Sequence, residues 1–110
     1  MEPARNEFVI LYADASLCRQ PLPIYSGDPP EPIAPDWLVI TESLIPGCVA
    51  DTFLLYFLRE NGEILEVLQW ETLEIALDQA DSIAGMRHSS WSRCRLQVPE
   101  SGRIARWLIT

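Results

Sequence analysis

The chain has 110 residues, of which 48% are hydrophobic and 22% charged, and its net charge is −8. The length fits one domain covering residues 1–110, and the composition is globular rather than disordered. The longest apolar run, Phe53 to Leu58, is far shorter than the ~20 residues of a membrane-spanning helix, and no secretory signal pattern begins the chain. We therefore expect a cytoplasmic protein without membrane contacts. Its negative charge also disfavours binding to the phosphate backbone of nucleic acids.

Short apolar segments, rich in β-branched and aromatic residues, predict the strands. In chain order they are residues 8–13, 37–45, 52–60, 63–70, 91–98 and 103–109. One helical turn at residues 14–19, with Asp14 as its N-cap, is expected after the first strand. The last two strands are expected to form a hairpin around residues 100–102, which would bring Arg95 and Trp107 together as a cation–π pair.

A proline-rich segment follows the first strand. It reads CRQPLPIYSGDPPEPIAPDW, residues 18–37, and contains six prolines. An interdomain linker is disfavoured because too few residues precede the segment to form a domain. A PxxP ligand is disfavoured because no basic residue flanks the motif. We favour an ordered loop at residues 18–36 that wraps over the sheet, anchored by Ile24, Tyr25, Ile33 and Trp37.

Asn61-Gly62 is a strong hairpin signal. A two-residue loop would place Glu60 opposite Glu63, so we predict a three-residue loop with Arg59 opposite Glu63 and Gly62 in the left-handed conformation of a bulge. This register predicts one face made of Phe53, Leu55, Phe57, Leu65 and Val67. The other face is also largely apolar, which predicts a hairpin in the middle of the sheet that needs cover on both sides.

The segment after this hairpin predicts a helix. Thr72 is a suitable N-cap and Gly85 a suitable C-terminal stop, and apolar residues recur between them at helical spacing. The predicted fold is therefore α+β, with a mainly antiparallel sheet of five to six strands and one principal helix, about 72–85, on one face. Because one helix covers one face only, the proline-rich loop or a second subunit is expected to cover the other, and we expect a homodimer.

Residues that carry chemistry are few. Cys18, Cys48 and Cys94 are far apart in sequence, and we interpret them as buried reduced thiols. His88 is the only histidine, and neither a nucleophile–base pair nor a set of metal ligands can be assembled around it. We therefore predict no catalytic residue, no cofactor and no metal site, and we expect a binding protein rather than an enzyme.

Acidic residues gather in the middle of the chain. Residues 28–81 hold twelve acidic residues against Arg59, whereas residues 82–110 hold five arginines against one glutamate. On the predicted helix, four acids share one face at i, i+3, i+7 and i+10, where like charges destabilise a helix. They are Glu71, Glu74, Asp78 and Asp81. This face is interpreted either as the solvated side of the helix, as a docking surface for a basic partner, or as a carboxylate metal site.

The run from Thr52 to Ala80, an Asn-Gly hairpin followed by QWETLEIALDQA, resembles a recurrent feature of small uncharacterised bacterial proteins. It also resembles some small acidic immunity proteins of bacterial toxin systems, in which a strand ending in Trp leads into a Thr-Leu-Glu helix start. The resemblance covers under a third of the chain. It implies a protein whose acidic face blocks a basic toxin.

The predicted function is a non-enzymatic acidic binding protein of the immunity or inhibitor type. Its predicted partner is a basic protein, held by Glu71, Glu74, Asp78, Asp81, Tyr25 and Trp37. One alternative is a small-ligand-binding or enzymatic domain with a pocket between the proline-rich loop and the sheet. The other alternative is a self-associating structural protein.

Overall fold

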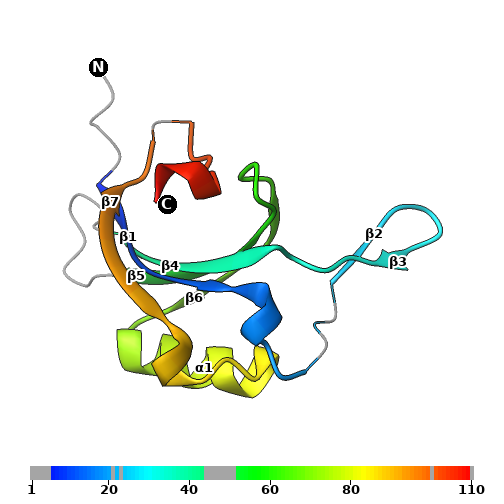
Figure 1. Ribbon diagram of the computed structural model, residues 1–110, viewed down its shortest axis with the longest axis horizontal. Helices are drawn as coiled ribbons and strands as arrows, with labels where there is room; N and C mark the ends of the chain where they lie inside the picture. Colours follow the sequence, from blue (N-terminus) through cyan, green and yellow to red (C-terminus); the bar gives the residue numbers. More distant parts are fainter. Residues whose placement is uncertain (1–5, 21, 23, 44–51, 100, 110) are drawn as a thin grey trace.

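A five-stranded antiparallel sheet forms the centre of the molecule, in the spatial order β6-β5-β4-β1-β7 (Figure 1). The computed structural model describes residues 6–20, 22, 24–43, 52–99 and 101–109. The strands of the sheet are β1 (Glu7–Asp14), β4 (Trp37–Ser43), β5 (Thr52–Leu58), β6 (Ile64–Trp70) and β7 (Ser92–Gln97). With the helix α1 (Leu73–Ala84), they confirm the predicted α+β fold. Across the described ranges, no helix is long and apolar enough to cross a membrane.

The helix α1 is bounded by the two residues that the sequence predicted, Thr72 and Gly85. The Thr72 hydroxyl accepts a hydrogen bond from the Ile75 N–H at 3.1 Å, and Gly85 ends the helix with φ +66°. A left-handed residue at this position suits glycine. Gly85 is also a point of close approach, because a Cβ there would lie 2.9 Å from the Cβ of Arg19. The helix therefore stops where the chain after β1 passes against it.

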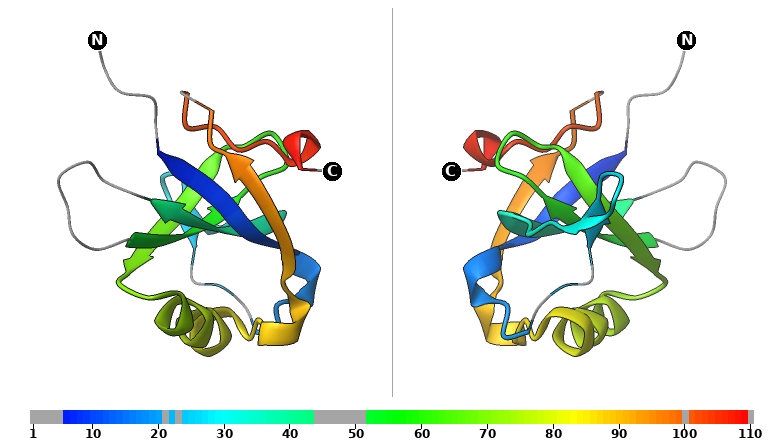
Figure 2. Two further views of the ribbon diagram at one scale, coloured as in Figure 1. Left: turned by 90° about the vertical axis from the view of Figure 1, so that its left-hand side faces the viewer. Right: turned by 90° about the vertical axis from the view of Figure 1, so that its right-hand side faces the viewer.

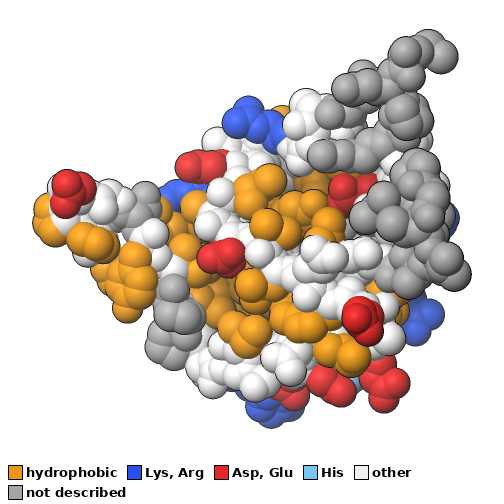
Figure 3. Space-filling view, turned by 180° about the vertical axis from the view of Figure 1, so that it is seen from behind, with side chains coloured by type: hydrophobic (Ala, Val, Ile, Leu, Met, Phe, Trp, Pro, Cys, Tyr) orange, Lys and Arg blue, Asp and Glu red, His pale blue; other side chains and the backbone are white. Residues whose placement is uncertain are grey.

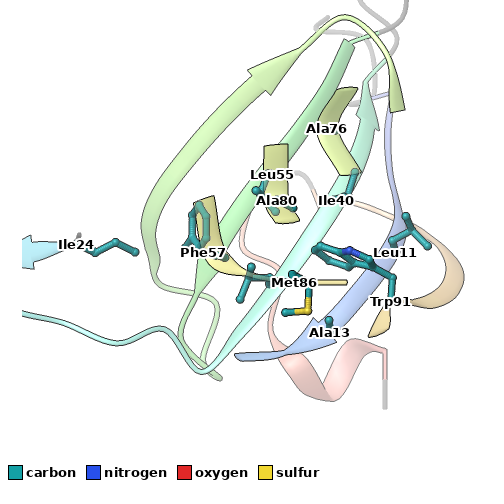
Figure 4. Close-up of a cluster of buried hydrophobic side chains, with 12 residues drawn as sticks. Leu11, Ala13, Ile24, Ile40, Leu55, Phe57, Ala76, Ala80, Met86 and Trp91 are labelled. Atoms are coloured by element: carbon teal, nitrogen blue, oxygen red, sulfur yellow. The ribbon is translucent and has the colours of Figure 1, made fainter. Parts of the chain in front are cut away.

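One face of the sheet packs against α1 (Figure 4). The helix presents small residues, Ala76, Ala80 and Ala84, all fully buried, so it approaches the sheet closely. We call this layer the helix-side core. Its buried members are Leu11, Ala13, Ile24, Leu38, Ile40, Leu55, Phe57, Ala76, Ala80, Ala84, Met86 and Trp91.

The opposite face is covered by the C-terminal segment, residues 101–109, so that α1 and this segment lie on the two sides of the sheet (Figure 2). We call this layer the C-terminal-side core. Its buried members are Val9, Trp37, Val39, Tyr56, Leu58, Val98 and Ile104. The prediction that the proline-rich loop covers this face was wrong, because Ile104 of the C-terminal segment lies there. The homodimer stays a prediction, although an uncovered second face no longer favours it.

The predicted strand at residues 103–109 was also wrong. The segment is irregular and ends in the 3-10 helix η3 (Arg106–Leu108). Its backbone bonds to the β5–β6 turn instead of to β7, since the Arg106 N–H donates to the Glu60 carbonyl at 3.0 Å. A segment that crosses the face of a sheet buries its apolar side chains without needing the ladder hydrogen bonds of a strand.

Arg106 fastens this segment to the rest of the fold. Its guanidinium lies 3.0 Å from the carboxylate of Asp14 and 3.8 Å from that of Glu60. Asp14 also accepts a hydrogen bond from the Ser16 N–H at 2.9 Å and caps the 3-10 helix η1 (Ala15–Leu17), as predicted. Hydrogen bonds from Ser16 and Arg106 hold the pKa of Asp14 below its ordinary value.

We therefore expect acid to weaken the attachment of the C-terminal segment. A carboxylate whose pKa is lower in the folded state stabilises the protein above its unfolded pKa, about 3.9, and loses that contribution as the pH falls through the folded pKa. Asp14→Asn should lose less stability between pH 7 and pH 3 than the unchanged protein does, as measured by urea unfolding. Equal losses in both proteins would show that Asp14 does not contribute. The effect is expected to be small because the pair is partly exposed.

A β-bulge at Ile10 lets β1 serve both cores. The register of β1 with β4 shifts between Val9 and Leu11. Regular alternation would place these two side chains on the same face, but Val9 belongs to the C-terminal-side core and Leu11 to the helix-side core. The extra residue at the bulge changes the face of the sheet to which the following side chains point.

The β5–β6 hairpin has the predicted loop. The Arg59 N–H donates to the Glu63 carbonyl at 3.0 Å, and Gly62 has φ +92°. The predicted faces were partly wrong, because a register shift at Leu65 places Leu68, rather than Val67, on the side of the helix-side core. The predicted central position was wrong for β6, which is an edge strand.

The proline-rich loop makes a small hairpin of its own, β2 (Tyr25–Ser26) with β3 (Glu31–Pro32), which projects from the body of the molecule (Figure 1). Its base packs on the helix-side core through Ile24, which is buried, and Ile33, which is partly buried. The loop therefore covers part of the helix side instead of the opposite face. Pro21 and Pro23 lie outside the described residues.

Candidate functional site

Two of the four acids on the acidic face of α1 contact a basic side chain. The Asp78 carboxylate lies 3.0 Å from His88 Nε2, and the Asp81 carboxylate lies 2.7 Å from Arg19 Nη2. Glu71 and Glu74 are exposed, and neither has an ion-pair partner within the part of the chain that the structure describes. The candidate docking surface on the helix is thus reduced to its N-terminal end.

Arg19 has a structural role at the other end of α1. Its Nε donates to the Gly85 carbonyl at 2.8 Å, and its backbone N–H donates to the Ala84 carbonyl at 3.1 Å. A cation is favourable at a helix C-terminus, where carbonyl groups lack helical partners. Arg19 and Asp81 therefore join the segment after β1 to the helix.

The structure separates the two aromatic residues predicted to contact a partner. Tyr25 is 61% exposed on the projecting hairpin. Trp37 is only 1% exposed, and its Nε1 donates to the Arg59 carbonyl at 3.0 Å. Trp37 is therefore a core residue and lies outside any binding surface.

The open edge of β6 is a feature that the sequence reasoning missed. Ile64 and Val67 are 47% and 42% exposed there. The Val67 N–H donates to the carboxylate of the adjacent Glu66 at 3.1 Å. An edge strand presents backbone groups that have no neighbouring strand, and at Val67 a side chain supplies the acceptor. The signal in the sequence was Glu66 itself, an acid within an otherwise apolar strand.

Apolar and acidic side chains are mixed on this side of the molecule. Figure 3 shows hydrophobic side chains gathered in the middle of the face, with separate acidic side chains among them and basic ones at its margins. We call five exposed residues at and beside this edge the β6 surface. They are Ile64 and Val67, on the C-terminal side of the sheet opposite Leu58 and Tyr56, Glu66, on the helix side opposite Phe57, and Glu71 and Glu74 at the start of α1.

The other edge of the sheet, β7, carries the opposite charge. Arg93 and Arg95 are both exposed on it. Arg95 lies over the ring of Phe8, 4.3 Å from its centroid. The predicted pair of Arg95 with Trp107 was wrong, because Trp107 lies on η3 and is exposed.

Two larger hollows accompany these surfaces. One, of about 510 Å³, lies between the segment after η1 and the returning arm of the proline-rich loop, and Cys18, Arg19 and Ile33 line it. The other, of about 500 Å³, lies between α1 and strands β1 and β7. The pocket predicted between the proline-rich loop and the sheet corresponds instead to a smaller hollow of about 160 Å³. Leu22 and Ile24 of the loop line it together with Phe57, Glu66 and Leu68 of strands β5 and β6.

The thiols that the structure describes have little nucleophilic character. Cys18 and Cys94 are free and partly buried, and burial raises the pKa of each thiol above its ordinary value. A protonated thiol is a weak nucleophile and a weak metal ligand. Cys48 lies outside the described residues. Over the described ranges, no three His, Cys, Asp or Glu side chains are grouped to hold a metal ion.

No family model, no curated protein and no solved structure matches this chain. The likeness to acidic immunity proteins stays a prediction. Function is therefore inferred from the geometry and charge of the surface.

Proposed function

We propose that this protein is a non-enzymatic binding domain that holds a basic protein partner against the β6 surface. The observation that carries the proposal is the open edge of β6. Exposed apolar side chains occur there together with acids that have no ion-pair partner among the described residues. Ile64 and Val67 offer apolar area at the centre of a contact, and the acids favour cationic side chains around it. This is the arrangement expected of an inhibitor or immunity protein acting on a basic target in the cytoplasm.

Addition of an extended segment to β6 is the binding mode that the edge favours. A partner strand would supply a backbone carbonyl to the Val67 N–H, which now donates to Glu66. The Glu66 carboxylate would then be released to pair with a basic side chain of the incoming strand. Backbone hydrogen bonds give affinity in this mode, and the side chains on either side give specificity.

The test is capture of the partner from host extract by immobilised protein, with matched charge reversals. Glu66→Arg is expected to reduce capture at least about tenfold, which corresponds to about 1.4 kcal/mol. Glu31→Arg is the control, since Glu31 is exposed on β3, away from β6. Val67→Pro removes the N–H that donates to Glu66, and it should also reduce capture.

Equal capture by the Glu66 and Glu31 variants would reject the β6 surface as the binding site. The protein alone should also be examined by sedimentation equilibrium at micromolar concentration. A dimer that Glu66→Arg converts to a monomer of 12.5 kDa would identify the partner as a second copy of this chain. A monomer in both cases would reject self-association.

A further inference from the structure

A groove runs along the helix side of the sheet where α1 leaves strands β1 and β7 partly uncovered. It has a volume of about 500 Å³, which is within the range of small-molecule sites. The walls are apolar, with Ile10 and Leu11 from β1 and Leu73 and Leu77 from α1. The strands that border the groove, β1 and β7, form the end of the sheet opposite β6. The groove shares no residue with the β6 surface.

The strands bordering this groove depart from regular pairing at this position. The register between β1 and β7 shifts between Val9 and Leu11, as does the register between β1 and β4. The bulged residue, Ile10, forms part of the groove wall. Bulges are common next to binding sites, where they redirect a side chain.

The groove wall contains an unsatisfied donor. Trp91 lines the groove and is 9% exposed, and Figure 4 shows its indole ring among Leu11, Ile40 and Met86. Its Nε1 is buried and has no hydrogen-bond partner among the described residues. A buried N–H without an acceptor destabilises the folded state. A polar atom of a bound molecule would supply an acceptor once the side chains over the nitrogen shift.

The groove also carries a cation that is open to a ligand. Arg93 is exposed beside Trp91 and, across the ranges that the structure describes, has no ion-pair partner. His88 also lines the groove, and its Nε2 lies 3.0 Å from the carboxylate of Asp78. An apolar groove with one available guanidinium favours an anion that has an apolar body.

We propose that this groove binds a small amphipathic carboxylic acid. The carboxylate pairs with the Arg93 guanidinium, and the apolar body lies between the leucines of α1 and Ile10. An oxygen of the ligand is the acceptor that Trp91 Nε1 lacks. The site is independent of the protein partner proposed for the β6 surface.

The test uses decanoate as the probe and the tryptophan indole N–H signals in nuclear magnetic resonance spectra as the readout. Comparison with the spectrum of Trp91→Phe assigns the Trp91 signal. This signal is expected to shift more than those of the other tryptophans, and to saturate with a Kd below about 1 mM. Arg93→Glu should weaken binding at least about tenfold, whereas Arg95→Glu, two positions along the same strand, should change it less than about twofold.

Decanol is the neutral control, and it should bind at least about tenfold more weakly than decanoate if the carboxylate pairs with Arg93. Three outcomes would overturn the proposal. They are the absence of a saturable shift at Trp91, equal effects of the two arginine variants, and equal binding of the alcohol and the acid. Circular dichroism of both arginine variants verifies that they are folded.

Discussion

Replacing Ile104 with aspartate is expected to lower the free energy of unfolding by about 3–5 kcal/mol. Ile104 is 1% exposed and belongs to the C-terminal-side core with Trp37 and Leu58. The substitution removes apolar contacts and places a carboxylate where water is excluded, and both changes disfavour the folded state. Urea unfolding followed by tryptophan fluorescence measures the loss.

Leu108→Asp is the matched control, because Leu108 is in the same segment and is 41% exposed. Its effect is expected to stay within about 0.5 kcal/mol. If the Ile104 and Leu108 variants are equally stable, the C-terminal segment does not cover the sheet in solution. The second face of the sheet would then be exposed in a monomer, and a dimer that buries this face would again be expected.

Replacing Glu7 with alanine is expected to cost about 2–5 kcal/mol. Glu7 is buried on the C-terminal side of the sheet, and its Oε2 accepts hydrogen bonds from Thr41 Oγ1 at 2.6 Å and from the Tyr56 hydroxyl at 2.8 Å. Alanine removes the acceptor from both hydroxyl groups at once. A buried polar group that loses its partner costs more than the hydrogen bond contributed.

Two variants separate the carboxylate from the rest of the side chain. Glu7→Gln keeps an oxygen acceptor and should cost less than Glu7→Ala. Tyr56→Phe removes one of the two hydroxyl donors and should cost about 1–2 kcal/mol. Equal stability of the alanine variant and the unchanged protein, measured by thermal unfolding and urea titration, would show that this buried cluster does not support the fold.

Both predictions concern the face of the sheet that the C-terminal segment covers. The residues chosen to test the β6 surface and the groove beside α1, Glu66 and Arg93, are exposed, unlike Ile104 and Glu7. Substitutions there are expected to change stability by no more than about 0.5 kcal/mol. Effects on binding can therefore be separated from effects on folding.

The positions of most strands and of the helix were evident from the sequence, because their signals are local. Thr72 and Gly85 bound α1 through hydrogen bonds and backbone conformation within a few residues. Asn61 and Gly62 predicted the three-residue loop, since the only alternative placed two glutamates opposite each other. Asp14 could be predicted as an N-cap because its carboxylate accepts a hydrogen bond from the nearby Ser16 N–H.

The candidate site was only partly predictable. Glu71 and Glu74 are exposed, as the helical pattern indicated, but Asp78 and Asp81 are paired with His88 and Arg19. Arg19 lies 62 residues away from Asp81, and no periodicity within a helix identifies so distant a partner. Trp37 was assigned to the surface for a similar reason, because its burial depends on a segment near the other end of the chain.

Only the tertiary structure decided which strand is the edge, which segment covers the second face, and where the strands change register. β6 is apolar like a central strand, and residues 103–109 are apolar like a strand, so composition could not separate an edge from a centre or a strand from a covering segment. Those outcomes depend on which backbone groups find partners in distant parts of the chain. The bulge at Ile10 likewise exists because β1 must pair with β4 and β7 while packing on both cores, which is a condition set by the whole sheet.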